Sequence, residues 1–201
     1  MLIELDPERP VPRKIKKIVE ALKNGEVVIY PTDTCYGMGA DIFNKKAIEK
    51  VYQIKGISKS QPFSFICSDL SDISQYARVS DQAYRILKRY LPGPYTFVLE
   101  GSKQVPKIML TKRKTVGIRV PDHPVCLEIV RQLGNPIIST TVSQGDEVFS
   151  DPRQMAKHFG KQVAIVVDAG IINPEPSSVI SLVDDNVEIL RRGKGACSDF
   201  E

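Results

Sequence analysis

The chain has 201 residues, of which 42% are hydrophobic and 26% are charged, with a net charge of +4. This ordinary globular composition predicts one domain over residues 1–201, and the mild basicity is compatible with anionic substrates or weak RNA contact without being diagnostic of either. The four cysteines lack zinc-ligand spacing, no apolar run has membrane-spanning length, and the acidic N-terminus is unlike a signal peptide, so we expect reduced thiols in the cytoplasm.

The first predicted element is a helix that ends at Asn24 and Gly25. Its apolar residues recur at helical spacing and are Ile15, Ile18, Val19 and Leu22. Its other positions include Arg13, Lys14, Lys16, Lys17 and Lys23. These basic residues either face RNA or form a solvated helix face, and the solvated face is the commoner meaning of such a run.

Strands and helices then alternate along the chain. Strands are predicted at 26–30, 63–67, 95–99, 116–120, 136–139, 163–167, 179–183 and 187–190, and helices at 44–54, 81–90, 123–133 and 152–159. The alternation is typical of an α/β fold. Because only three residues separate the last two strands, they are predicted to form an antiparallel hairpin, which makes the sheet mixed.

The segment PTDTCYGMGAD at 31–41 lies between the short apolar strand predicted at 26–30 and the helix predicted at 44–54. Ligands in open α/β sheets bind where strands pass into helices. Small hydroxyls and glycine amides at such a place favour a carboxylate or phosphate site over a packed core.

Two basic residues stand out from their surroundings. Lys55, at the end of a predicted helix, either binds an anion or interacts with the helix dipole. Arg119 lies inside an apolar strand, where an arginine needs a partner. That partner is either a protein carboxylate, which would be structural, or a ligand carboxylate or phosphate.

Three further segments are candidates for binding anions. They are the hydroxyl run at 139–143, the polar loop at 170–178 and the basic, glycine-rich end at 190–195. No dinucleotide-binding or Walker glycine pattern is present. Cys35 has no nearby histidine or lysine in sequence, so it is interpreted as a small packing residue rather than a nucleophile.

These motifs together resemble the YrdC-like family of threonylcarbamoyl-AMP synthases, and within it the YciO branch. The segments that carry the resemblance are PTDTCYGMG, VYQIKG, LPGPYTFVL, VGIRVPDHP, PIISTTVS, PSSVISL and ILRRG, from about residue 10 to residue 193. The resemblance implies a twisted open mixed α/β sheet with flanking helices and a large, concave, basic cavity.

The same resemblance implies a reaction and its partners. L-threonine, bicarbonate and ATP, the last with Mg²⁺, would form threonylcarbamoyl-adenylate and pyrophosphate for the threonylcarbamoyladenosine modification of tRNA. Family members are also described as binding double-stranded RNA. All three substrates carry negative charge, so such a site needs fixed cations and oriented donors more than a protein nucleophile.

Site residues follow from the resemblance by position. Lys55 and Arg119 would be catalytic; the threonine contacts would be Thr34, Arg119, Ser139 and Ser177. The nucleotide contacts would be Lys55, Gln61, Thr115, Thr141, Ser143, Ser150 and Arg191. No residue is expected to bind a metal directly.

The chain departs from the family pattern at four places. The arginine of the K-x-R motif is Ile57, and the S-x-N motif reads Thr141-Val142-Ser143. Gln61 and Ile66 replace an asparagine and a histidine. Loss of one bidentate guanidinium contact costs roughly 1.5–3 kcal/mol. Lys59 is a candidate substitute for the missing arginine, although lysine lacks the planar fork.

The sequence is therefore compatible with three functions. The first is a synthase that is weak or altered in substrate. The second is a non-catalytic protein of the same fold that binds double-stranded RNA or tRNA. The third is a related enzyme that acts on another carbamoyl or nucleotide substrate.

Overall fold

The structure is a computed structural model, and it describes residues 1–59, 61–111 and 114–201. Its α-helices are α1 (Pro12–Lys23), α2 (Lys45–Lys55), α3 (Leu70–Tyr76), α4 (Asp81–Tyr90), α5 (Pro124–Leu133) and α6 (Pro152–Phe159). Its strands are β1 (Leu2–Glu4), β2 (Val28–Tyr30), β3 (Gly37–Gly39), β4 (Ser64–Ile66), β5 (Ala77–Arg78), β6 (Tyr95–Gly101), β7 (Thr115–Arg119), β8 (Ile137–Thr141), β9 (Ser143–Gln144), β10 (Glu147–Val148), β11 (Ile165–Asp168), β12 (Ser178–Ser181) and β13 (Glu188–Arg191). Three short 3₁₀ turns lie at Lys107–Met109, Val183–Asp185 and Ser198–Phe200.

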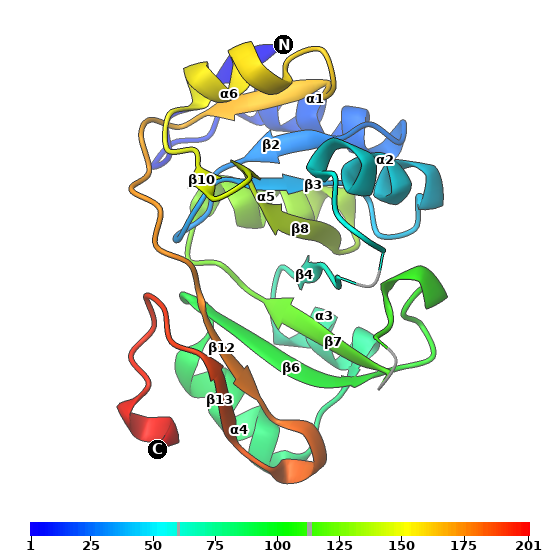
Figure 1. Cartoon of the computed structure of the whole chain (residues 1–201), viewed down its shortest axis with the longest axis vertical. Helices are drawn as coiled ribbons and strands as arrows, with labels where there is room; N and C mark the ends of the chain where they lie inside the picture. Colours follow the sequence, from blue (N-terminus) through cyan, green and yellow to red (C-terminus); the bar gives the residue numbers. More distant parts are fainter. Residues whose placement is uncertain (60, 112–113) are drawn as a thin grey trace.

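All described strands except β9 and β10 form one long twisted sheet (Figure 1). Its order is β1-β11-β2-β3-β8-β4-β7-β6-β12-β13, with β5 added beside β6. The pairs β1–β11, β11–β2, β4–β7 and β6–β12 are parallel, whereas the other pairs of this order are antiparallel. A separate hairpin joins β9 to β10. The predicted mixed α/β sheet with flanking helices is confirmed.

Helices cover both faces of the sheet at its β1 end and one face at its β13 end (Figure 1). The helices α1 and α5 pack on one face of the first strands, where their apolar residues share a core with Tyr30 and Val167. Helices α3, α4 and α6 contribute to the other core, which holds Phe65, Phe97 and Val166. The face that α1 and α5 cover near β2 and β11 is therefore left open beyond β8.

Every strand and helix predicted from the sequence corresponds to an observed element, with ends that differ by a few residues. The antiparallel hairpin of the last two predicted strands is confirmed as β12 and β13. The strands and α-helices missed from the sequence are β1, β3, α3, β5, β9 and β10, which have at most seven residues each. Segments this short give too few turns or alternations to show a period.

One prediction about the 31–41 motif is wrong. The motif does not pass directly from strand to helix, because residues 37–39 turn back as β3 and pair antiparallel with β2. Its glycines serve close packing: a Cβ on Gly37 would lie 2.8 Å from the ring of Tyr30, and one on Gly39 would lie 2.2 Å from the carbonyl oxygen of Ile138. These glycines therefore make room for an aromatic ring and a neighbouring strand.

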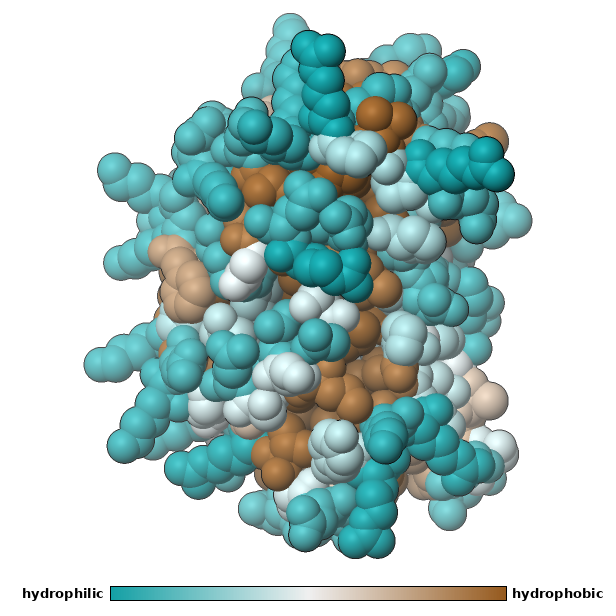
Figure 2. All heavy atoms as spheres, turned by 180° about the vertical axis from the view of Figure 1, so that it is seen from behind, coloured by the Kyte–Doolittle hydropathy of each residue, from teal (hydrophilic) through white to brown (hydrophobic). Residues whose placement is uncertain are grey.

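Hydrophilic side chains cover most of the back face, and apolar residues show between them (Figure 2). The four cysteines are buried and free, in agreement with the expected reduced thiols. Among the described helices, none combines the length and the hydropathy that crossing a bilayer requires.

Candidate functional site

A cavity of about 310 Å³ opens on the uncovered face of the sheet. Strand alternation explains its lining, because residues two apart along a strand share a face. In β7, Thr115, Gly117 and Arg119 line the cavity, whereas Val116 and Ile118 pack in the core on the other side. The other lining residues are Thr34, Pro62, Phe63, Ser64, Thr96, Val98, Thr111, Ser139, Thr140, Thr141, Pro176, Ser177, Val179 and Arg191.

The cavity begins where α5 stops covering the sheet. Along β8, Ile137 packs beneath α5, and the residues that follow on the same face are Ser139 and Thr141. Strand β4 shows the same change, from Ile66 under the helix to Ser64 in the cavity. Apolar side chains thus give way to hydroxyls at the point where the sheet loses its helical cover.

Arg119 forms the most buried ion pair among the described residues. Its Nη2 donates to Oδ1 of Asp33 and to Oγ1 of Thr34, each at 2.9 Å. The side chains of Arg119 and Asp33 are 11% and 10% exposed. Asp33 also accepts the backbone N–H of Asp122 through Oδ2. Of the two partners that the sequence allowed for Arg119, the protein carboxylate is therefore present. The pairing with Asp33 explains the burial of Arg119 without a ligand.

One donor of Arg119 is nevertheless unused. Its Nε is buried and finds no hydrogen-bond partner within the described part of the chain. A buried donor without a partner costs free energy, which a ligand oxygen at this place would recover. The Arg119 side chain, which lines the cavity, therefore combines a structural set of contacts with a buried donor that is unsatisfied.

A second guanidinium lies across the cavity at the end of β13. Arg191 donates from Nε and Nη2 to the carbonyl oxygen of Ser177, at 3.1 and 2.9 Å. The Ser177 hydroxyl is 2.8 Å from that of Thr96. Burial, and secondly the charge of Arg119, lower the pKa of Arg191. A bound anion would stabilise the charged form of Arg191 at this place.

Thr34 is presented by a compact loop between β2 and β3. The Thr32 hydroxyl donates to the carbonyl of Cys35 at 2.5 Å and accepts the backbone N–H groups of Thr34 and Cys35. This local network fixes the turn without help from secondary structure. Burial raises the pKa of the Cys35 thiol, which agrees with its interpretation as a packing residue.

The structure brings together seven of the residues singled out from the sequence. These are Thr34, Thr115, Arg119, Ser139, Thr141, Ser177 and Arg191, all of which line the cavity. Sequence reasoning missed Asp33 and Thr96. The signal that could have found Thr96 is the alternation of polar and apolar residues along β6.

Lys55 lies elsewhere than expected. Its Nζ donates to the carbonyl oxygens of Thr141 and Ser143, each at 3.0 Å, and to the Ser143 hydroxyl at 2.6 Å. All three ammonium donors are thus used within the chain, at the turn from β8 to β9. In this structure the Lys55 ammonium and the Ser143 hydroxyl thus bond to each other outside the cavity lining, and their contact with a nucleotide stays a prediction.

Two other expected nucleotide contacts also lie outside the cavity lining. Gln61 is exposed, and its carbonyl accepts the hydroxyl of Tyr52 at 3.0 Å. Ser150 is half-buried, and its carbonyl accepts the N–H of Ile172 at 3.1 Å. The sequence Ser58-Lys59-Ser60-Gln61-Pro62 predicts a polar turn after α2, and residue 60 of this segment falls outside the described residues.

The departures from the family pattern have clear positions. Ile57 packs half-buried against the main core, and Ile66 is fully buried beside Arg119 in the paired strand. Lys59 pairs with Glu49 at 2.9 Å on the exposed side of α2. In this structure its ammonium therefore contacts Glu49 and does not line the cavity.

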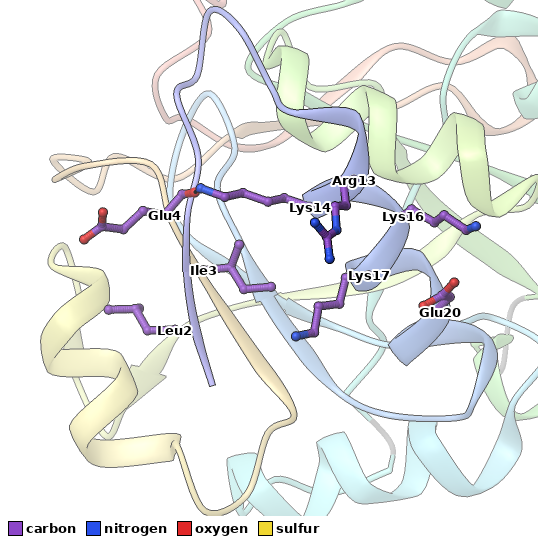
Figure 3. A pocket seen from close by; sticks show the side chains of 8 residues that line it. All are labelled: Leu2, Ile3, Glu4, Arg13, Lys14, Lys16, Lys17 and Glu20. Carbon is purple, nitrogen blue, oxygen red and sulfur yellow. Dashed lines mark hydrogen bonds between the residues drawn. The ribbon is translucent and has the colours of Figure 1, made fainter.

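A second and larger cavity, of about 900 Å³, lies between β1 and α1 (Figure 3). It is lined by Leu2, Ile3, Glu4, Arg13, Lys14, Lys16, Lys17 and Glu20. Lys14 reaches from α1 to the carbonyl of Glu4 at 2.6 Å, and Lys17 extends toward β1. The basic run of the first helix thus borders a groove at the open edge of the sheet.

The described residues hold no group of three or more His, Cys, Asp or Glu side chains that could bind a metal ion. The cavity lining supplies hydroxyls and guanidiniums instead. Mg²⁺ prefers carboxylates, phosphates and water as ligands. The side chains that line this cavity in the described structure are thus unlike the ligands that Mg²⁺ prefers.

Comparison with known proteins identifies the family. The Sua5/YciO/YrdC family model, described as telomere recombination, matches residues 20–193. The chain belongs to the Sua5/YciO/YrdC family. This confirms the resemblance seen in the sequence, and the family includes threonylcarbamoyl-AMP synthases.

Individual members match over most of this chain. The YciO protein of Escherichia coli is 37% identical over 199 residues, which cover 98% of this chain and 97% of that protein. Its crystal structure gives a TM-score of 0.94 at 35% identity, covering 100% of this chain and 99% of that one. The threonylcarbamoyl-AMP synthase of Vibrio vulnificus is 30% identical over 157 residues, covering 76% of this chain and 84% of the synthase.

A structure of P. abyssi Sua5 complexed with L-threonine gives a TM-score of 0.90 at 26% identity. It covers 96% of this chain, and this chain spans 57% of that protein. The Sua5/YciO/YrdC sheet therefore occurs both in proteins of this length and as part of a longer chain.

Proposed function

We propose that this protein is a nucleotidyltransferase of the threonylcarbamoyl-AMP synthase type. It would join L-threonine, bicarbonate and ATP into threonylcarbamoyl-adenylate and release pyrophosphate, for the modification of tRNA in the cytoplasm. The observation that carries this proposal is the pair Arg119 and Arg191 in one hydroxyl-lined cavity. Two fixed cations among hydroxyls suit a ligand set with a carboxylate and phosphates.

The threonine carboxylate is assigned to the free donor of Arg119. Its buried Nε has no partner among the described residues, and Thr34, Ser139 and Ser177 add hydroxyls to the lining of the same cavity. A carboxylate oxygen at Nε would form a charge-assisted hydrogen bond and remove an unsatisfied buried donor. The amino group, as its carbamate, would then face the nucleotide.

The nucleotide phosphates are assigned to Arg191, with Thr115 and Thr141 as further contacts. The attack of a carbamate on the α-phosphate needs alignment and charge neutralisation, which two guanidiniums supply without a protein nucleophile. At about 310 Å³ the cavity is near the small end of ligand sites, so the nucleotide would extend beyond its rim. Mg²⁺ would arrive on the phosphates of ATP, since no cluster of metal-binding side chains for it occurs among the described residues.

The departures at Ile57 and Ile66 make this synthase slow or altered in substrate. The guanidinium missing at position 57 represents roughly 1.5–3 kcal/mol of anion binding. No compensation comes from Lys59, because its ammonium pairs with Glu49. A weak reaction is thus expected, with L-threonine recognition retained at Arg119.

Mass spectrometry of the products tests this function directly. Purified protein would be incubated with ATP, Mg²⁺, bicarbonate and L-threonine, and the product mass of threonylcarbamoyl-adenylate is expected only when all substrates are present. Isotope exchange between pyrophosphate and ATP should depend on L-threonine and bicarbonate. Folded protein that gives neither product nor exchange would refute the proposal. Thermal protection by nucleotide without any effect of threonine would favour a different substrate.

A second candidate function, binding of double-stranded RNA or tRNA, is supported by the groove between α1 and β1. Four cations line it, Arg13, Lys14, Lys16 and Lys17, against the two carboxylates Glu4 and Glu20. Such a cluster attracts a phosphate backbone and makes binding dependent on salt.

Charge reversal distinguishes an RNA site from a solvated helix face. The double variant Arg13→Glu/Lys17→Glu should weaken binding to duplex RNA and reduce the salt slope by about two. The exposed pair Lys88→Glu/Lys103→Glu makes the same charge change outside the groove. Equal losses in the two variants, or no RNA retained by the wild type at low salt, would exclude the groove as an RNA site.

A further inference from the structure

The segment 192–195, here called the C-terminal strap, runs beside the residues that enter β12. The N–H of Lys194 donates to the carbonyl of Pro176 at 2.9 Å, and that of Gly193 donates to the Ser178 hydroxyl at 3.0 Å. The same hydroxyl, which is fully buried, donates to the carbonyl of Gly195 at 2.5 Å. The strap is thus bonded to one wall of the cavity at three points.

Two glycines allow this close approach. A Cβ on Gly193 would lie 2.1 Å from the carbonyl oxygen of Pro176, and one on Gly195 would lie 2.4 Å from the ring of Tyr95. Neither distance is possible for a real side chain, so both positions require glycine while the strap stays in place. Lys194 stands between them, and its backbone position is fixed on both sides.

The Lys194 side chain crosses to the loop that presents Thr34. Its Nζ donates to the backbone carbonyl of Asp33 at 2.6 Å. The carboxylate of the same aspartate is held by Arg119 and by the N–H of Asp122. Asp33 is therefore fixed from β7, from the segment before α5 and from the strap.

We propose that Lys194 is a positioning residue that holds the 31–36 loop against the cavity. Through this loop it keeps Thr34 and Arg119 in the geometry that receives the acid group of the substrate. The role rests on the proposed function only in naming L-threonine as that substrate. The hydrogen bond from Lys194 to the carbonyl of Asp33 is part of the fold and does not depend on the identity of the substrate.

Binding of L-threonine, measured by isothermal titration calorimetry, tests the role. We expect Lys194→Ala to weaken binding by about fivefold to tenfold, because the loop loses a charge-assisted hydrogen bond. Lys194→Arg keeps a cation of similar reach and should recover most of the affinity. Gly193→Ala should reproduce the loss with Lys194 intact, because the added methyl displaces the strap.

Arg192→Ala is the matched control in the same segment. Arg192 pairs with Glu201 at 2.9 Å, and its side chain is 63% exposed. Its removal should leave threonine affinity unchanged. If Arg192→Ala weakens binding as much as Lys194→Ala, or if Lys194→Ala leaves affinity unchanged, the positioning role is refuted.

A second readout does not depend on any substrate. Cys35 lies in the loop and is 5% exposed, so its rate of alkylation by N-ethylmaleimide reports loop opening. Lys194→Ala should accelerate modification of Cys35, followed by peptide mass spectrometry, with the fully buried Cys67 and Cys126 unchanged. Unchanged Cys35 kinetics would overturn the proposal. If Lys194→Ala accelerates Cys35 modification but the wild type binds no threonine, the role of the strap in holding the loop is supported and the proposed function is rejected.

Discussion

The ammonium of Lys55 donates to the hydroxyl of Ser143 at 2.6 Å and also bonds the carbonyls of Thr141 and Ser143. This contact ties the end of α2 to the turn that follows β8. Burial lowers the pKa of Lys55, as expected for an ammonium withdrawn from water. A residue expected to act on substrate thus supports the backbone behind the cavity.

Replacing Lys55 by methionine should destabilise the fold. Methionine keeps the aliphatic stem but leaves two carbonyls without this donor, at a cost of about 1–3 kcal/mol in the free energy of unfolding. Urea denaturation measures the loss. Lys59→Met removes an exposed pair with Glu49 and should cost less than about 0.5 kcal/mol. Unaltered stability in Lys55→Met would show that these bonds contribute little to the fold and would favour the expected contact of Lys55 with substrate.

Removing Arg119 alone would leave the Asp33 carboxylate buried and unpaired, at a cost of about 3–5 kcal/mol. The double variant Asp33→Asn/Arg119→Met avoids this charge, and the asparagine oxygen can still accept the N–H of Asp122. We expect it to fold and to lose the thermal shift caused by L-threonine. Thermal denaturation with and without L-threonine checks both points. A shift equal to that of the wild type would place the carboxylate site elsewhere.

The isoleucine at position 57 is expected to limit the reaction. Ile57→Arg should raise the rate of threonine-dependent ATP–pyrophosphate exchange by roughly tenfold or more, since a guanidinium contact represents about 1.5–3 kcal/mol. Ile57→Lys is the matched comparison, because it adds charge without the planar fork and should gain less. Equal rates in Ile57→Arg and the wild type would mean that the missing guanidinium does not limit this chain.

His123 makes stability depend on pH. Burial lowers the pKa of His123 below the ordinary value of 6.5, and this effect outweighs the carboxylates of Asp33, Asp122 and Glu8, which act to raise it. The Nδ1 atom of His123 is buried without a partner in the described structure. As pH falls below 6.5, the unfolded chain takes up a proton before the folded chain does, so the free energy of unfolding decreases. The free energy of unfolding should stop decreasing once the pH is below the pKa of His123 in the folded protein, because both states are then protonated.

Denaturation curves between pH 8 and pH 5 check this effect. His123→Asn should lose less stability over that range than the wild type, because the titrating group is gone. His158→Asn replaces an exposed histidine and serves as the control. An identical pH dependence in His123→Asn and the wild type would contradict the assignment.

The alternation of apolar and polar segments was enough to predict the main helices and strands, because periodicity is a local property of the chain. The same local pattern at β7 placed an arginine among apolar residues and so marked Arg119. The hydrogen bonds of Lys55 could not be predicted from a local pattern. The partners of Lys55 are 86 and 88 residues away along the chain, and spacing in the sequence does not tell which carbonyls a lysine will meet.

Sequence motifs by themselves determined the family, the mixed α/β sheet and seven residues that line one cavity. Only the tertiary structure decided that Asp33 pairs with Arg119, that Lys55 faces backbone carbonyls, and that Lys194 closes the loop at Asp33. The physical reason is that hydrogen bonds and ion pairs act over a few ångströms in space. Their partners are set by the order of strands in the sheet and by where α5 stops covering it.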